Sequence, residues 1–185
     1  PLEDGVITVT RSGGAVTFPA NFMLCASMNP CPCGNYGSAD RVCTCTPAAI
    51  RKYRTRVSGP LLDRIDIQVE VDTVKYEDLA GAVLEENSAA VKKRVERARE
   101  VQRARFSGPL TNSDMGEREL KKFCLLSREC EEILRMSFES LKLSARARSR
   151  IIKVARTIAD MAESERICPE HILEAVSYRK YDNMS

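Results

Sequence analysis

The sequence has 185 residues, 43% of them hydrophobic and 30% charged, which is enough for one ordinary domain or two small ones. It has no apolar run of about 18 residues and no basic segment followed by an apolar stretch, so neither a membrane span nor an intact signal peptide is expected in it. Lysine and arginine (29) exceed aspartate and glutamate (26) by only three. That excess alone does not indicate nucleic-acid binding.

The first 72 residues carry the patterns of an α/β fold. Residues 6–10 and 16–18 are β-type runs separated by Ser12-Gly13-Gly14-Ala15, which predicts a short hairpin with Arg11 in its loop. The continuous apolar run 22–28 is typical of a buried strand in a parallel sheet, and Asn29-Pro30 ends it.

A basic helix and a second strand follow. Thr46 before Pro47 predicts an N-cap and a helix that continues to about Val57, where Ser58-Gly59-Pro60 ends or kinks it. Apolar and polar residues alternate over 65–71, a pattern that predicts either a buried strand or an edge strand.

The rest of the chain is helical in pattern. Residues 73–86 are acidic and predict a linker or a short surface helix between two lobes. The expected organisation is therefore α/β over 1–72, a linker over 73–86 and an all-α bundle over 87–185. Apolar spacing predicts helices over five segments: 88–106, 117–124, 128–142, 144–163 and 169–178. The first of these is strongly basic.

Four of the eight cysteines lie within fifteen residues: Cys31, Cys33, Cys43 and Cys45. Four thiolates can surround a Zn²⁺ ion tetrahedrally, and such a closed site is structural because no position remains for water. The Cys-x-Cys spacing also permits disulfides or free thiols. The pattern favours a zinc loop over 30–46 in a protein of the reducing cytoplasm. The other cysteines are expected to be small core residues.

Three further positions have both a functional and an ordinary interpretation. Asn29, after the first predicted strand, suits contact with a phosphate or an attacking water, or is a turn residue. Arg64 lies between Asp63 and Asp66 and is either a surface ion-pair residue or an arginine finger. Arginines 146, 148 and 150 open a helix without acidic neighbours, which indicates an anion site or a solvated basic face.

Several chemical motifs are missing from the sequence. It contains neither a Gly-x4-Gly-Lys-Ser/Thr phosphate loop nor a Gly-x-Gly-x-x-Gly motif after a strand, and no apolar strand ends in paired acidic residues for Mg²⁺. The single histidine, His171, has no evident partner and is expected to be structural or solvated. This chain alone is not expected to hydrolyse nucleotides.

Taken in order, these segments resemble the second half of a Mg-chelatase-like AAA+ ATPase of the bacterial ComM/YifB type. The resemblance covers nearly the whole chain, and its motifs are specific as an ordered set. It is carried by residues 1–5 with the hairpin, 16–24, 28–34, 58–66 and 155–160.

The resemblance implies a role for each candidate residue. Asn29 would be the sensor-1 residue, Arg64 an arginine finger acting on a neighbouring subunit, and Arg146 the sensor-2 arginine of a helical lid, with Arg148 and Arg150 as competitors. It also implies that the phosphate loop and the Mg²⁺-binding strand lie upstream of Pro1, in a longer protein.

The implied activity is ATP hydrolysis with Mg²⁺ in a homo-oligomeric ring, a hexamer. ComM-type proteins are associated with natural transformation and DNA branch migration, so single-stranded or branched DNA is the expected partner, with the helix over 88–106 and the hairpin as contacts. Two alternatives stay open. In the first, the protein is the ATPase motor subunit of a metal chelatase or of a protein-remodelling complex. In the second, it is a zinc-stapled module that binds nucleic acid or protein.

Overall fold

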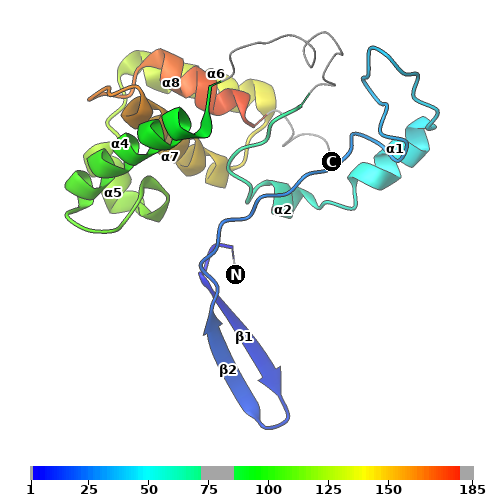
Figure 1. The fold of residues 1–185 in the computed structure, drawn as a ribbon, viewed down its shortest axis with the longest axis horizontal. Coiled ribbons are helices and arrows are strands. Elements are labelled where there is room, and N and C mark those ends of the chain that lie inside the picture. Colours follow the sequence, from blue (N-terminus) through cyan, green and yellow to red (C-terminus); the bar gives the residue numbers. More distant parts are fainter. Residues whose placement is uncertain (1, 72–85, 180–185) are drawn as a thin grey trace. The chain divides into compact units, whose positions relative to one another are not determined.

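The computed structural model describes residues 2–71 and 86–179 (Figure 1). The chain divides into two compact units, Pro1–Arg64 and Ile65–Ser185. Apart from Glu86, the predicted linker over 73–86 lies outside the described residues. Within the described ranges, no helix has the length and apolar character needed to cross a bilayer.

The predicted hairpin is confirmed in the first unit. Strands β1 (Val6–Arg11) and β2 (Gly14–Pro19) pair antiparallel, and Arg11 lies opposite Gly14, inside the ladder and not in the loop. Side chains alternate across such a ladder, so one face carries the apolar pairs Ile7–Phe18 and Val9–Val16.

The prediction of a buried strand over residues 22–28 is wrong. The segment has no regular secondary structure, and Met23 is 92% exposed. Among the described residues the only strands are β1 and β2, which pair with each other. The segment therefore lacks the neighbouring strands that a parallel sheet requires and the layer that would cover its side chains.

The prediction of a second strand over residues 65–71 is also wrong. This segment belongs to the second unit, where the amide of Gln68 donates to the carbonyl of Tyr178 at 3.0 Å. The guanidinium of Arg179 donates to the carbonyl of Ile65. Contacts with the C-terminal end of the chain thus replace the expected ladder, and the sheet in the described residues is only the hairpin.

Local signals place the two helices of the first unit. In α1 (Pro47–Arg54), the hydroxyl of Thr46 accepts a hydrogen bond from the amide of Ala49 at 3.2 Å, as predicted for an N-cap. The helix ends three residues before Val57. The segment Ser58-Gly59-Pro60, which was expected to end or kink α1, begins a second short helix, α2 (Gly59–Leu62). Proline suits the first turn of a helix.

The second unit is a helical bundle, as expected (Figure 1). Helix α7 lies at its centre and contacts α4, α5, α8 and a short 3₁₀ helix, η1, while α8 also packs on α6. Side-chain caps from Asn87, Ser127 and Ser144 begin α4, α6 and α7. The elements are α4 (Ser88–Phe106), η1 (Asn112–Asp114), α5 (Glu117–Phe123), α6 (Arg128–Leu141), α7 (Ala145–Met161) and α8 (Pro169–Ser177).

The core of the bundle lies along one face of α7. Ile151, Ala155 and Ala159 are almost fully buried, together with Leu134 of α6 and Ile172 of α8. Burial of these apolar side chains at 3.6-residue spacing is what holds the helices together.

Two of the cysteines outside the cluster, and His171, contribute to the structure of the bundle. Cys124 and Cys130 are buried in the bundle core, as expected, whereas Cys25 is exposed, because the segment that carries it is not a strand. The Nδ1 atom of His171 accepts a hydrogen bond from the amide of Cys168 at 3.0 Å and caps α8.

A polar cluster is buried beside this core and was not predicted. The carboxylate of Asp160 on α7 is bound by the guanidinium groups of Arg105 and Arg156 and by the amide of Asn112. Arg156 also donates to the carbonyls of Ser164 and Glu165. The segment 155–160 is therefore part of the internal framework of the bundle.

Candidate functional site

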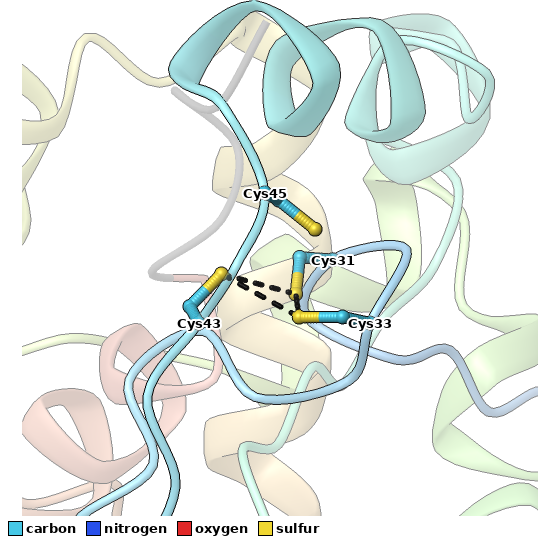
Figure 2. A group of neighbouring side chains, drawn as sticks. All are labelled: Cys31, Cys33, Cys43 and Cys45. Atoms are coloured by element: carbon cyan, nitrogen blue, oxygen red, sulfur yellow. Dashed lines mark hydrogen bonds between the residues drawn. The ribbon is translucent and has the colours of Figure 1, made fainter.

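The cysteine loop brings four sulfur atoms together. The Sγ atoms of Cys31, Cys33, Cys43 and Cys45 all lie within 4.8 Å of one another (Figure 2). A turn in which the amide of Gly34 donates to the carbonyl of Cys31 at 3.0 Å reverses the chain after the first pair. Gly34 has φ +81°, a left-handed conformation that glycine adopts without strain.

The sulfur separations fit a tetrahedral metal site. The Sγ atom of Cys31 lies 3.4 Å from that of Cys33 and 3.7 Å from that of Cys43, and the Cys33–Cys43 separation is 3.6 Å. Four sulfurs at about 2.3 Å from a central Zn²⁺ are separated by about 3.8 Å. A disulfide would require about 2.05 Å. The arrangement is therefore that of four free thiols able to hold one metal ion.

The surroundings of the cluster favour a thiolate at one of its cysteines. Hydrogen bonds from the backbone amides of Asn35 and Thr44, with a contribution from Cys31, lower the pKa of Cys33 to about 5. Burial acts in the opposite direction on Cys45 and raises its pKa to about 12. Backbone amides directed at sulfur are the usual outer support of a tetra-cysteine metal centre.

The loop and helix α1 are connected at both ends of the helix. Cys45 directly precedes the N-cap Thr46. From the last turn of α1, Nε of Arg54 donates to the carbonyl of Pro30 at 3.2 Å, and its guanidinium lies 4.7 Å from the centre of the Tyr36 ring. The four-cysteine cluster and α1 thus form one local framework.

Asn29 lies two residues before Cys31, in an irregular segment and not at the end of a strand. Its side chain is exposed and borders an open hollow of about 530 Å³. The residues that line this hollow are Ser27, Met28, Asn29, Tyr53, Arg56 and Val57. Asn29 is therefore accessible to a ligand, and the cationic side chain of Arg56 lines the same hollow.

Arg64 lies just after α2 and is partly exposed. Its guanidinium forms an ion pair with Glu3 at 3.2 Å and donates to the carbonyl of Pro60 at 2.8 Å. The ordinary interpretation of Arg64, a surface ion pair, is thus realised within the first unit. Glu3, which is remote in sequence, is one of its partners, and the sequence suggested only the adjacent carboxylates.

The three arginines at the start of α7 differ in their contacts. Arg148 pairs with Glu131 of α6 at 3.0 Å, and Arg150 pairs with Asp66 at 2.5 Å. Arg146 is exposed, and its guanidinium has no hydrogen-bonding or ionic partner among residues 2–71 and 86–179. It is the member of the three whose charge is available to an external anion.

Much of the positive charge of α4 is neutralised inside the unit. Arg94 pairs with Glu86, Arg97 with Glu163, and Arg105 with the buried Asp160. Lys92 lies 3.7 Å from the carboxylate of Glu96. The basic helix singled out in the sequence therefore offers fewer cations to a partner than its composition suggests.

Comparison with known proteins finds similarity along the whole chain. Residues 1–79 match the family of magnesium chelatase subunit ChlI, and residues 85–179 match its C-terminal domain. The chain is 41% identical to the uncharacterized protein YifB of Escherichia coli over its full length and 38% identical to the competence protein ComM of Haemophilus influenzae over 97% of its length. It spans 36% and 35% of those proteins, about a third of each.

Proposed function

This chain belongs to the Mg-chelatase-like family, in the group that includes YifB and ComM, and from that premise we propose that the whole protein is an AAA+ ATPase that remodels DNA. The observation that carries the proposal is the ordered match of both parts of the chain to the two magnesium chelatase domains. The choice of DNA as substrate is supported by the 38% identity to a competence protein.

In this proposal three residues face the nucleotide. Asn29 orients the attacking water or senses the γ-phosphate, and Arg64 leaves Glu3 to stabilise the charge that develops on a phosphate bound by the neighbouring subunit. Arg146 acts as sensor 2, which its exposure and the ion pairs of Arg148 and Arg150 support. A finger that acts between subunits requires a ring, for which we propose a hexamer.

The nucleotide substrate is ATP with Mg²⁺. The sequence supplies amide and guanidinium groups for its phosphates but contains no Gly-x4-Gly-Lys-Ser/Thr loop. Cradling of the phosphates must then come from residues other than these 185, so we expect no turnover from this chain alone.

The tetra-cysteine cluster holds one structural Zn²⁺ ion in our proposal. Three sulfurs separated by 3.4–3.7 Å, a fourth within 4.8 Å of each of them and supporting backbone amides fit this ion. When bound, zinc would cross-link the two halves of the loop. Among the chain's own residues, Thr46 caps the start of α1 directly after Cys45, and Arg54 joins its last turn to the carbonyl of Pro30.

The decisive experiment measures ATP hydrolysis by the full-length protein with and without single-stranded and branched DNA. DNA-stimulated turnover is the expected result. Turnover that is indifferent to DNA would contradict the DNA-remodelling role, and the absence of turnover would contradict the ATPase itself.

Two other functions have specific support. The description of the matching family favours an ATPase motor subunit of a metal chelatase, which would need partner subunits and show no DNA stimulation. The cysteine cluster next to a basic helix favours a zinc-stapled binding module, which would bind its target without ATP hydrolysis.

A further inference from the structure

Helix α1 and the turn that follows it carry exposed cations to which the proposal above gives no role. We propose that this cationic face, formed by Arg51 and Lys52 of α1 and by Arg56 of the following turn, binds the phosphate backbone of single-stranded DNA. The inference rests on the proposed function for the identity of the polymer, and on α1 and the cysteine loop for the location of the contact.

The charge of this face is not neutralised locally. All three side chains are exposed, and no ion pair or hydrogen bond engages their charged groups within the described part of the chain. No aspartate or glutamate occurs between Asp40 and Asp63. A row of free cations without carboxylates is the electrostatic footprint of a phosphate-binding surface.

The helix directs Arg51 and Lys52 away from its buried side. At 100° per residue, they lie about 100° and 160° around the axis from the buried Ile50. Arg56 lies in the turn just beyond the end of the helix. Arg54 lies only about 40° from Ile50 and is used internally, on Pro30 and Tyr36. The sequence alone makes the four cations equivalent, whereas the structure separates one anchor from three outward charges.

The face is held in place before any ligand arrives. Cys45 and Thr46 fix the start of α1 to the cysteine loop, and Arg54 fixes its last turn to the same loop. A preorganised surface loses little conformational entropy on binding. The helix dipole favours cations in the last turn, but it does not explain the absence of acidic residues on either side of α1.

The expected basic contact on α4 differs in its carboxylates. Arg94, Arg97 and Arg105 are in ion pairs, which leaves Lys93, Arg99 and Arg103 as its exposed cations without a partner in the described ranges. The exposed carboxylates of Glu96 and Glu100 lie among these cations, whereas residues 41–62 contain no acidic residue. We therefore place the main strand contact of this chain on α1.

The test measures binding of the zinc-loaded 185-residue chain to a fluorescein-labelled single-stranded oligonucleotide by fluorescence anisotropy across a salt series. The variant is Arg51→Gln/Lys52→Gln/Arg56→Gln. Its matched control, Arg118→Gln/Lys121→Gln/Arg166→Gln, removes the same charge from exposed positions of the bundle. A third variant, Lys93→Gln/Arg99→Gln/Arg103→Gln, tests α4, and Arg51→Lys/Arg56→Lys preserves the charge of the proposed face.

We expect the α1 variant to lower the slope of log affinity against log salt by about 2, since each contact to a single strand contributes about 0.7. At low salt its affinity falls at least about tenfold. The control and the lysine variant keep both values close to those of the parent chain, and circular dichroism of the α1 variant matches the parent.

Three results would overturn the inference. The first is equal binding by the α1 variant and its control, and the second is absence of DNA binding by the parent chain. The third is equal affinity for phosphatidylglycerol vesicles with the same loss in the variant, which would indicate a membrane surface as the partner. None of these three results would change DNA-stimulated ATP hydrolysis by the full-length protein. Failure of the proposed α1 contact can therefore be distinguished from failure of the proposed function.

Discussion

Arg105 of α4 and Asp160 of α7 are joined by two parallel hydrogen bonds, Nη1 to Oδ2 at 2.7 Å and Nη2 to Oδ1 at 2.5 Å. The carboxylate of Asp160 is fully buried and the side chain of Arg105 is 12% exposed. This pairing raises the pKa of Arg105, with the hydrogen bond to Asp160 as the main cause. It connects α4 and α7 through two residues that are 55 positions apart in the chain.

Replacing Asp160 removes the shared acceptor of this cluster. Asp160→Ala would leave Arg105 and Arg156 buried without a counter-charge, which lowers the free energy of unfolding by about 3–5 kcal/mol. Asp160→Asn, which keeps an acceptor oxygen, should lose less. Urea denaturation measures both.

The matched control for Asp160 is Glu132→Ala. Glu132 also pairs with an arginine, Arg135, but both side chains are 56% exposed. We expect no measurable change in the denaturation midpoint of this variant. If Asp160→Ala behaved like the control, the buried cluster would not be a major source of stability.

Loss of one sulfur ligand should abolish metal binding. Cys33→Ser is expected to reduce the zinc content from about one ion per chain to near zero, because a three-sulfur site binds far more weakly. The check is elemental analysis of reduced protein purified with zinc. Cys25→Ser, at an exposed cysteine outside the cluster, should keep one ion. Retention of zinc by Cys33→Ser would exclude the proposed ligand set.

Burial raises the pKa of the Cys124 thiol from 9.0 to about 11. The folded chain then keeps this proton at pH values where the unfolded chain releases it, so Cys124 lowers stability progressively as the pH rises from about 9 towards 11. Denaturation of the parent chain and of Cys124→Ala at pH 8 and pH 10 should show a smaller loss on raising the pH in the variant. Equal losses would contradict the burial effect.

Arg64→Ala should lower the turnover of the full-length protein by about a thousandfold or more and leave nucleotide binding intact, as loss of an arginine finger does. Arg64→Lys should stay impaired, because an ammonium group lacks the planar fork of guanidinium. The measurements are steady-state hydrolysis and equilibrium binding of labelled ATP. Unchanged turnover would mean that Arg64 serves only its ion pair with Glu3.

Arg146→Ala should reduce turnover at least about tenfold without changing thermal stability, because Arg146 makes no ionic contact within the described residues. Arg148→Ala and Arg150→Ala are the matched controls, since each removes an arginine from the same helix start that is already paired. If Arg148→Ala or Arg150→Ala were the variant with impaired turnover, the sensor-2 assignment would move to that residue.

The sequence predicts well those elements that depend on contacts between residues a few positions apart. Thr46 caps its helix as expected, and the hairpin forms between its two β-type runs. The cysteines also meet as expected, because only a short loop separates the two pairs. Hydrogen bonds and loop closures over a few residues depend little on the rest of the chain.

Features that depend on distant partners required the tertiary structure. Residues 22–28 are apolar enough for a buried strand, but a strand needs neighbours, and β1 and β2 pair only with each other in the described part of the chain. The sequence likewise left Arg146, Arg148 and Arg150 equivalent; Glu131 and Asp66, remote in sequence, distinguish them. Burial of Asp160 between Arg105 and Arg156 is of the same kind, because the desolvation of a charge depends on which helices pack around it.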